Sequence, residues 1–275
     1  MIAVACYLWK GSRDFRPEHV DALARMVRAH LPIAHRFVCV TDYPQQAFST
    51  EVTAAEIPAI AMKLLLHANP CGDKFPVSYP RLWTFSEQAR ALGDLVLLLD
   101  VDCMVLRSML PLFAIDADFV GWRVRPAPGN PRRFGGGTWL LRTGTRVHVW
   151  DEFIANPEAA IARAAASGYL GSDQAWISYK LSETEREWPE PSGIYCAQDY
   201  RKSWVRETKR HEKLTRRRAQ LPTKYRAALT PAPAPLRAPE DAIILHMNGE
   251  QKPWTVDDPV VRQYWRPYFR DPLAC

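Results

Sequence analysis

Apolar runs alternate with amphipathic segments along this chain, as in proteins that alternate strands and helices. Short apolar runs predict strands, and segments with an apolar residue every three or four positions predict helices. The predicted strands are 1–9, 36–41, 95–99, 138–141 and 242–245, and the predicted helices are 17–30, 80–92, 146–154 and one that begins near residue 173. In the first helix, Val20, Leu23, Ala24 and Val27 share one face, which we expect to cover a sheet. The order predicts an α/β fold with a mixed sheet flanked by helices.

The length and composition agree with one enzyme-sized domain over residues 1–275. A chain of 275 residues with 47% hydrophobic content can bury one substantial core. No apolar run is long enough to span a bilayer, and residues 1–9 lack the basic region and cleavage site of a signal peptide, so we interpret them as a core strand. The six cysteines form no C-x-x-C pair and several lie in apolar runs, which favours reduced thiols and a cytoplasmic location.

Two acidic residues, Asp100 and Asp102, follow the apolar run at 95–99. This run predicts a strand buried on both faces, and such strands deliver functional side chains where they end. Residues i and i+2 of an extended chain point the same way, so both carboxylates are expected to reach one cation. The alternative is an aspartate that caps the next turn beside a solvated aspartate.

A second group of polar residues is the string H-M-N-G-E-Q-K-P-W at 246–254, which follows the apolar run 242–245. His246 therefore also stands where a strand is expected to end. An imidazole with two carboxylates suits Mn²⁺, and carboxylates with phosphate oxygens also accept Mg²⁺. Gly249 lets the backbone approach an anion closely, and Lys252 supplies a positive charge for phosphate. A single histidine after a strand is more often structural, but the complete string favours a site.

These motifs resemble those of the glycogenin-like glycosyltransferases, which include bacterial lipopolysaccharide galactosyltransferases and have the GT-A fold, a nucleotide-binding mixed sheet. The resemblance covers most of the chain, although D-x-D alone is a weak signal. It implies that Asp100, Asp102 and His246 hold Mn²⁺ on the diphosphate of a nucleotide sugar. It also implies that Gly249 and Lys252 contact the phosphates, that the donor is a UDP-sugar, and that transfer of the hexosyl group retains the anomeric configuration.

Two further segments match this family in the expected order. Arg81, in Y-P-R-L-W, occupies the place of the family's basic residue before the D-x-D strand, and an exposed helix residue is the alternative. The string G-S-D-Q at 171–174 resembles the G-x-D-Q that opens a helix and faces the donor sugar. It makes Asp173 and Gln174 the best catalytic candidates, although Ser172 as a helix cap with Asp173 in the first turn explains part of the string structurally.

Residues near the first two strands are candidates for contacts with the nucleoside. Asp42 follows the strand at 36–41, where a base or ribose contact is expected in a nucleotide-binding sheet, and turn capping is the alternative. Tyr7 is a candidate to stack on the base, and packing in the core is the alternative. The sequence F-G-G-G at 134–137 stands where the family often has F-N-x-G. The asparagine amide that could contact the sugar or the acceptor is therefore absent, and the family's acceptor geometry cannot be assigned to this chain. We interpret these glycines as a tight loop before the strand at 138–141.

Positive charge is concentrated in one segment. The net charge of the chain is +6, and residues 201–226 contain 11 Lys or Arg against two Glu, so the rest of the chain is slightly acidic. A Pro/Ala-rich stretch follows at 230–235. We interpret 199–239 as a basic helical insertion or lid that attracts an anionic glycan or glycolipid acceptor, an acidic membrane surface or nucleic acid. A solvated helix without a specific partner is the alternative.

The sequence therefore predicts a metal-dependent glycosyltransferase, cytoplasmic and in peripheral contact with a membrane through 201–226. One alternative is a phosphatase of the haloacid-dehalogenase type, whose nucleophile also lies in a D-x-D, although Cys103 and Met104 follow here without the usual threonine. The other is a nucleic-acid-binding protein with an inactive transferase-like body. Trp204 and Tyr225 accompany the basic residues, but at a spacing that matches no recognised nucleic-acid module.

Overall fold

A computed structural model of the protein describes most of the chain. The described residues are 1–12, 14–124, 129–131, 133–198, 201, 209–210, 212–213, 216, 236–247, 249 and 252–270. Most of the expected insertion at 199–239 lies outside these residues, so its predicted role as a basic helix or lid stays a prediction. Within the described ranges, no helix has the length and apolar character needed to cross a membrane.

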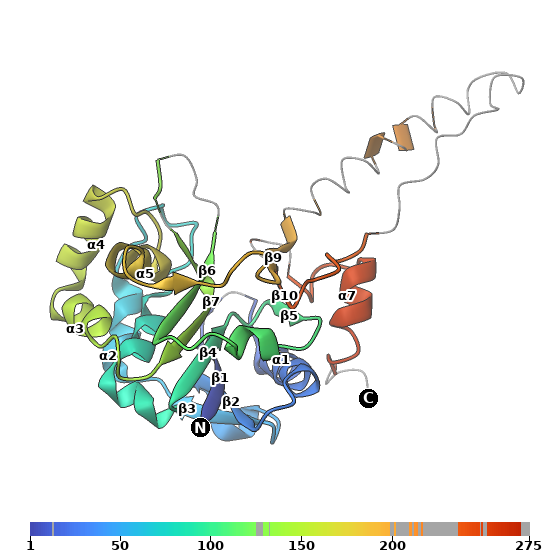
Figure 1. Ribbon diagram of the computed structural model, residues 1–275, viewed down its shortest axis with the longest axis horizontal. Coiled ribbons are helices and arrows are strands. Elements are labelled where there is room, and N and C mark those ends of the chain that lie inside the picture. Colours follow the sequence, from blue (N-terminus) through green and yellow to red (C-terminus); the bar gives the residue numbers. More distant parts are fainter. Residues whose placement is uncertain are drawn as a thin grey trace, which may run out of the picture.

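Seven strands form the central sheet, in the order β3-β2-β1-β4-β7-β6-β8 (Figure 1). Their bounds are β1 Ile2–Leu8, β2 His35–Thr41, β3 Val52–Glu56, β4 Leu95–Leu99, β6 Phe119–Arg123, β7 Phe134–Arg142 and β8 Arg186–Glu187. β1 is parallel to β2 and β4, whereas β7 is antiparallel to β4 and β6. Every residue of β4 is Leu or Val, which suits a central strand that is covered on both faces. The α/β fold with a mixed sheet is thereby confirmed.

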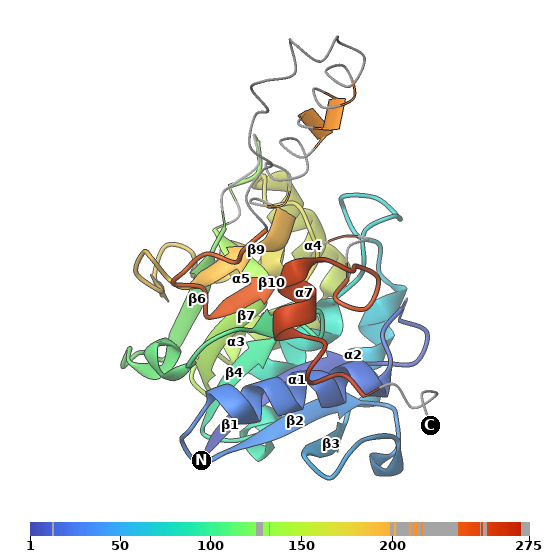
Figure 2. The same ribbon diagram turned by 90° about the vertical axis from the view of Figure 1, so that its right-hand side faces the viewer.

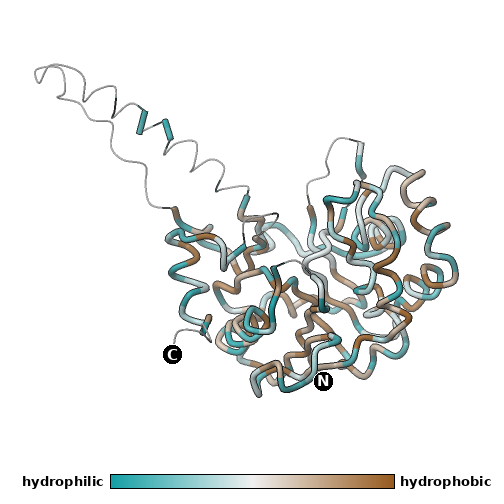
Figure 3. Tube along the Cα trace, turned by 180° about the vertical axis from the view of Figure 1, so that it is seen from behind, coloured by the Kyte–Doolittle hydropathy of each residue, from teal (hydrophilic) through white to brown (hydrophobic). Residues whose placement is uncertain are grey.

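Helical segments cover both faces of this sheet. α1 (Pro17–His30) lies across one face with α7 (Pro259–Tyr264) beside it, as Figure 2 shows. The other face carries η3 Tyr79–Phe85, η4 Glu87–Ala91, α3 His148–Ala155, α4 Pro157–Ala166 and α5 Asp173–Leu181. Shorter segments are η1 Gln45–Ala47, α2 Ala59–Met62, η2 Lys63–Leu66 and η5 Leu110–Phe113. Hydrophobic residues run through the central strands (Figure 3), and alternate residues of β1 enter the two cores.

A second sheet of three strands begins where β4 ends. It consists of β5 (Cys103–Val105), β10 (Ile244–His246) and β9 (Ile194–Cys196), with β10 in the middle. β10 is antiparallel to β5 and parallel to β9. The chain passes from the first sheet to the second through the D-x-D segment, and His246 is the register partner of Cys103. The pairing of β5 with β10 therefore brings the C-terminal string next to the two acids.

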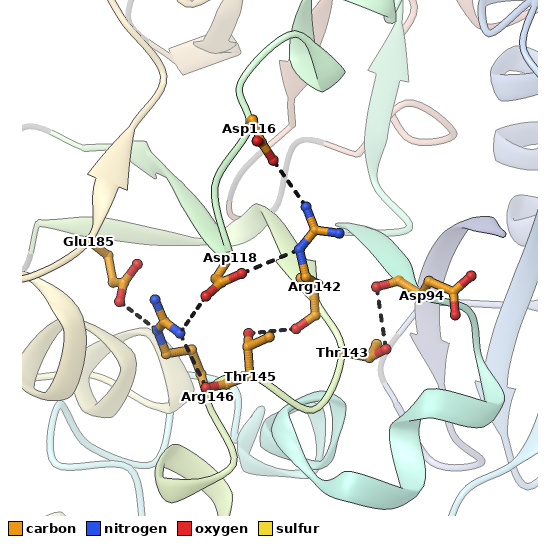
Figure 4. Close-up of polar contacts among 8 residues, drawn as sticks. All are labelled: Asp94, Asp116, Asp118, Arg142, Thr143, Thr145, Arg146 and Glu185. Atoms are coloured by element: carbon orange, nitrogen blue, oxygen red, sulfur yellow. Dashed lines mark hydrogen bonds and ion pairs between the residues drawn. The ribbon is translucent and has the colours of Figure 1, made fainter.

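An ion-pair network lies at the C-terminal end of β7, opposite the end that carries the three glycines (Figure 4). Arg142 pairs with Asp116 at 3.1 Å and with Asp118 at 3.3 Å, and Arg146 pairs with Asp118 at 3.1 Å and Glu185 at 2.6 Å. Such partly exposed pairs contribute little to stability one by one. The network ties the end of β7 to the start of β6 and to the segment after α5, far along the strand from the three glycines.

Two predicted elements differ from the structure. The helix expected at 80–92 is replaced by the short 3-10 helices η3 and η4, which meet at Ser86. Every residue of η3 is buried, so this segment runs through the core and is not an amphipathic surface helix. The tight loop expected at 134–137 is instead the first part of β7, which begins at Phe134, the register partner of Arg123 in β6. The helix at 17–30 and the strand at 95–99 have the predicted bounds.

Candidate functional site

The D-x-D segment is a turn between two sheets. The N–H of Asp100 still donates to the Gly137 carbonyl at 2.9 Å, and the N–H of Cys103 donates back to the Asp100 carbonyl at 3.2 Å. The two acids thus lie in a tight turn and not on the extended chain that the sequence suggested. Their side chains consequently have different partners, because Asp100 pairs with Arg81 and Asp102 pairs with Lys252.

His246 and Asp100 face each other across a space that a glycine leaves open. A Cβ atom on Gly137 would lie 2.6 Å from Cε1 and 2.8 Å from Nδ1 of His246, and 2.7 Å from Oδ2 of Asp100. The other ring nitrogen, Nε2, makes a hydrogen bond of 2.8 Å with the hydroxyl of Thr138. The structure therefore brings a carboxylate and an imidazole together at the point where any larger residue at 137 would intrude.

The predicted metal triad is assembled only in part. Within the part of the chain that the structure describes, no three His, Cys, Asp or Glu side chains are grouped closely enough to hold a metal ion. Asp100 and His246 nevertheless fit a cation chemically, and the missing side chain at Gly137 leaves room beside them. Asp102 completes a three-ligand set only if it leaves Lys252. The metal site with Asp100, Asp102 and His246 therefore stays a prediction.

Lys252 is held by two different contacts. Its ammonium pairs with Asp102 and lies 5.1 Å from the centre of the Phe15 ring, just before α1. Gly249 precedes it with a φ of 74°, in the left-handed region that favours glycine. The position of the lysine suits an anion close to the D-x-D turn, but the phosphate contacts of Gly249 and Lys252 stay predictions.

Arg81 bridges two acids beneath the glycines of β7. It pairs with Asp100 and with Asp173, whose carboxylate lies 2.8 Å from the guanidinium and is fully buried. A Cβ atom on Gly136 would lie 2.8 Å from Nη2 of Arg81 and 3.0 Å from Oε1 of Gln174. Arg81 is thus a buried residue of the site and not an exposed helix residue. Asp173 and Gln174, at the start of α5, lie beside it as the predicted order implied.

Burial dominates the electrostatics of this site. Burial, with the nearby charge of Asp100, raises the pKa of Asp102 to about 6, although Lys252 opposes the shift. Burial lowers the pKa of His246 to about 4, so the imidazole is neutral near pH 7 and keeps a lone pair for a ligand. Burial also raises the pKa of Asp173, and the positive charge of Arg81 opposes that shift. Lys252 and Arg81 therefore oppose the rise in pKa that burial causes in these two acids, and their positive charges also suit an anionic substrate.

Of the two nucleoside candidates, Tyr7 lies on β1 and Asp42 directly follows β2, as the sequence suggested. The hydroxyl of Tyr7 is 2.8 Å from that of Thr84, and its ring is buried in the core that includes η3. Asp42 accepts a hydrogen bond of 2.8 Å from the N–H of Lys10 and lines a pocket of about 950 Å³. Tyr43, Glu56 and Lys63 also line this pocket. Contacts of Tyr7 and Asp42 with a base or ribose stay predictions.

Sequence reasoning missed several residues that shape the site. Gly136 and Gly137 were attributed to a loop, Thr138 was assigned only to a strand, and Trp122 was given no role. The signal was the run of three glycines itself, because glycine inside a strand often marks a close approach by another group. In this protein the approaching groups are the side chains of Arg81, Asp100 and His246.

Comparison with known proteins places the fold. No protein-family model and no curated protein matches the chain. It is similar to the glycosyltransferase GlyE of Streptococcus pneumoniae TIGR4 in its apo form, with a TM-score of 0.56 and 16% identity over 98% of this chain and 60% of GlyE. It is also similar to the galactosyltransferase LgtC in complex with donor and acceptor sugar analogues, with a TM-score of 0.59 and 14% identity over 97% of this chain and 94% of LgtC.

These similarities concern the fold. The chain spans about 60% of the length of GlyE and nearly the whole of LgtC. An active-site mutant of LgtC, in which a glutamine is replaced by glutamate, matches with a TM-score of 0.58 and 13% identity. The expected GT-A-like fold is confirmed, and the polar residues described above lie where β4 and β10 end.

Proposed function

We propose that this chain is a metal-dependent glycosyltransferase that moves a sugar from a nucleotide sugar to an acceptor hydroxyl. One observation carries the proposal: the side chains of Asp100, His246 and Arg81 converge on the glycines of β7, in a fold shared with LgtC. Lys252 joins them through Asp102. Sugar transfer requires that the charge of a leaving diphosphate be neutralised and that the acceptor be positioned, and this set of ligands and cations suits the first task.

The cation would be held by Asp100 and His246, with Asp102 as a third ligand. Mn²⁺ suits two carboxylates with an imidazole, and Mg²⁺ is an acceptable substitute when phosphate oxygens take part. When bound, such an ion supplies Lewis-acid neutralisation of the departing diphosphate. The neutral state of His246 near pH 7 and the open space beside Gly137 support this assignment.

The residues of the chain then have separate tasks. Lys252 leaves Asp102 to pair with a phosphate, and Gly249 allows the backbone to approach the same group. Arg81 pairs with the carboxylates of Asp100 and Asp173 and so fixes their positions beneath the glycines of β7. Gln174, half-buried at Gly136, is the best-placed amide to contact the sugar. The active-site glutamine of LgtC, replaced in its described mutant, supports a role for an amide in such a site.

The donor, the stereochemistry and the partners rest on the resemblance and on charge. We propose a UDP-sugar donor, with the base near Tyr7 and Asp42, and retention of the anomeric configuration. The acceptor would be an anionic glycan or glycolipid, recruited by the basic segment 201–226, which would also provide peripheral contact with a membrane. The anomer released when the enzyme hydrolyses its donor in water, observed by NMR, tests retention directly.

The decisive experiment is release of nucleoside diphosphate from a panel of nucleotide sugars, with Mn²⁺, with Mg²⁺ and with a chelator. We expect metal-dependent release of UDP from a UDP-sugar. The Asp102→Asn variant should lose both this release and metal-dependent donor binding. Asp118→Asn, which removes one carboxylate charge in the remote network of Figure 4, is the matched control and should behave like wild type. Release of phosphate from phosphate esters, or Mn²⁺/UDP affinity unchanged in Asp102→Asn, would overturn the proposal.

A further inference from the structure

The imidazole of His246 is held on two sides by residues that do not belong to the predicted ligand set. The hydroxyl of Thr138 lies 2.8 Å from Nε2, and the indole of Trp122 stacks on the ring with centroids 4.6 Å apart and planes 10° from parallel. His246 is 1% exposed, Thr138 is fully buried and Trp122 is 8% exposed. One contact controls the rotation of the ring within its plane, and the other controls the tilt of that plane.

Thr138 lies on β7 and Trp122 lies on β6, and the pairing of these strands places both residues next to His246. Thr138 follows Gly137 in β7 and pairs with Leu99, the last residue of β4, which sets its hydroxyl beside the D-x-D turn. The register between β6 and β7 shifts between Gly121 and Arg123, so Trp122 lies at a bulge, a feature that often re-aims a side chain.

A glycine makes room for this indole. A Cβ atom on Gly135 would lie 2.6 Å from Cε3 of Trp122, so a side chain at 135 would push the indole away from His246. The first glycine of the run thus clears space for Trp122, and the third clears space between His246 and Asp100.

The hydrogen bond to Thr138 decides which edge of the imidazole is available. With Nε2 engaged, Cε1 and Nδ1 face Gly137 and the Oδ2 atom of Asp100. A hydroxyl accepts as well as donates hydrogen bonds, so the Thr138 oxygen can accept a hydrogen bond from the Nε2–H group, which leaves the Nδ1 lone pair free. Partners of this kind around a ligating histidine fix its tautomer and orientation.

We propose that Thr138 and Trp122 are positioning residues, which hold His246 with its free nitrogen directed toward Asp100 so that both groups can bind one divalent cation. This inference rests on the proposed function, because it assigns roles around the same cation. It adds two residues outside the D-x-D and H-x-x-G-x-x-K-P-W motifs. It also explains why residue 135 is a glycine, since a side chain there would displace the Trp122 indole.

The test compares Thr138→Val, which keeps the shape but loses the hydroxyl, with Thr138→Ser, which keeps the hydroxyl. The probes are Mn²⁺ alone and Mn²⁺ with UDP, followed by EPR, and protein labelled with ¹⁵N-histidine reports the coupling of a ligating nitrogen to Mn²⁺. Thr138→Val should bind Mn²⁺ about 10- to 100-fold more weakly and lose or alter the nitrogen coupling, whereas Thr138→Ser should keep both close to wild type.

A matched control separates positioning from stability. Thr143, just after the remote end of β7, is also buried and donates from its hydroxyl to the Gly93 carbonyl at 2.7 Å. Thr143→Val should lower the melting temperature without changing Mn²⁺ affinity or the nitrogen coupling. An equal loss of Mn²⁺ affinity in Thr143→Val and Thr138→Val would overturn the positioning role.

The indole provides a second, independent route. Trp122→Phe keeps an aromatic face for His246 and should retain most Mn²⁺ affinity, whereas Trp122→Leu should weaken Mn²⁺ binding and alter the nitrogen coupling. This pair decides the question if Thr138→Val does not fold. Wild-type Mn²⁺ affinity and coupling in folded Thr138→Val and Trp122→Leu would refute the inference.

Failure of the proposed function gives a different result. If wild-type protein binds Mn²⁺ without nitrogen coupling, or His246→Gln binds it equally well, then His246 is not a ligand and the proposed cation site itself is wrong. If wild type shows the coupling and His246→Gln lacks it, only the variants at 138 and 122 bear on the positioning role.

Discussion

Lys252 and Asp102 form an ion pair at the point where the proposed function needs both of them for other partners. Asp102 is 6% exposed, and a buried carboxylate without a nearby cation would be costly. In the proposed function, binding of a metal-nucleotide complex would exchange these partners, because the cation would pair with the Asp102 carboxylate and the diphosphate would pair with Lys252. The two ligands should therefore bind cooperatively, each removing the group that competes with the other.

Replacement of Lys252 by methionine tests this exchange, because it should change two affinities in opposite directions. Methionine keeps an apolar stem over Phe15 but removes the charge. Loss of a charge-assisted contact should weaken UDP binding in the presence of Mn²⁺ by about 1.5–3 kcal/mol, roughly 10- to 100-fold. Mn²⁺ alone should bind more tightly, because Asp102 has lost its cationic partner. Calorimetry should be done near pH 8, since burial and Asp100 raise the pKa of Asp102 to about 6.

Lys180→Met is the matched control for this substitution. Lys180 pairs with Glu152 at 2.8 Å and lies 5.7 Å from the centre of the Trp176 ring, so it makes the same two kinds of contact outside the site. It should change neither affinity. Weaker binding of Mn²⁺ alone to Lys252→Met, or an equal loss of affinity for uridine, would contradict the exchange and indicate a damaged fold.

Gly137→Ala should weaken Mn²⁺ binding and donor hydrolysis more than it lowers the stability of the fold. The added Cβ atom would lie within 2.8 Å of two ring atoms of His246 and of Oδ2 of Asp100, so one of these groups must move. We expect Mn²⁺ affinity and donor hydrolysis to fall at least about tenfold, as for other displaced ligand shells.

Gly121→Ala provides the comparison for this glycine. Its Cβ atom would lie 2.2 Å from the ring of Phe134, a comparable intrusion into the core rather than between the ligands. It should lower the melting temperature more than Mn²⁺ affinity. If Gly137→Ala retains wild-type Mn²⁺ binding, the space beside Gly137 is not where the cation lies.

At the scale of elements, the start of α1 is joined to the turn that carries Lys252 through a neutral histidine. His19 is 5% exposed, accepts a hydrogen bond of 3.1 Å at Nδ1 from the N–H of Arg16, and stacks on Trp254 with centroids 3.7 Å apart. Burial lowers the pKa of His19 to about 4, with Arg16 acting in the same direction and Asp14 against it. The folded protein therefore keeps this ring neutral at pH values where the unfolded chain protonates it.

The free energy of unfolding should therefore depend on pH within a defined window, and it should decrease as the pH is lowered. Between the ordinary histidine pKa, about 6.5, and the folded value, about 4, the unfolded state binds one more proton than the folded state. The free energy of unfolding should therefore decrease as pH falls through this window, by about 1–3 kcal/mol from His19. Urea unfolding at several pH values should show a smaller loss in His19→Gln, which keeps a side chain able to accept from Arg16. Equal slopes for the two proteins would rule out His19.

The elements also show how far periodicity predicts structure. Helix α1 was predicted with its bounds because Pro17 suits a first helical turn and the apolar stripe has the helical period. The segment at 80–92 was not, since η3 is buried on all sides and its packing overrides any amphipathic pattern. The glycines at 135–137 were misread because their local preference is for loops, whereas they lie within β7, between Phe134, which pairs with Arg123 of β6, and Thr138, which pairs with Leu99 of β4.

At the scale of the whole molecule, the sequence motifs predicted that the D-x-D segment and the histidine string lie together, but not how they meet. The D-x-D and histidine strings were expected together because both follow apolar strands. They meet through a second sheet, in which β5 pairs with β10, and no local pattern encodes that pairing. Thr138 and Trp122 could not be identified from the sequence for the same reason, because the contacts with His246 depend on the pairing of Thr138 with Leu99 and on the bulge at Trp122.

The distribution of charge over the whole chain leads to a last prediction. Residues 201–226 carry a local charge of +9 on a chain whose remainder is slightly acidic, and Arg216, a described member, is exposed. Exposed charges act over about a Debye length, roughly 10 Å at 0.1 M salt, whereas the site depends on close contacts. Reversal of Arg216, Arg217 and Arg218 to glutamate should therefore reduce binding to vesicles that contain anionic lipid and flatten its salt dependence, while donor hydrolysis persists.

The control for this triple variant is reversal of Arg28, Arg90 and Arg262, three exposed residues of the folded body whose substitution changes net charge by the same amount. If the effect depends on local charge, this control should retain vesicle binding, because its charges are spread over separate parts of the surface. Both variants should be compared with wild type at low and high salt, with donor hydrolysis measured in the same samples. Equal losses in the two variants would show that only net charge matters. Wild-type vesicle binding by the variant at 216–218 would identify the basic segment as a solvated insertion without an anionic partner of this kind.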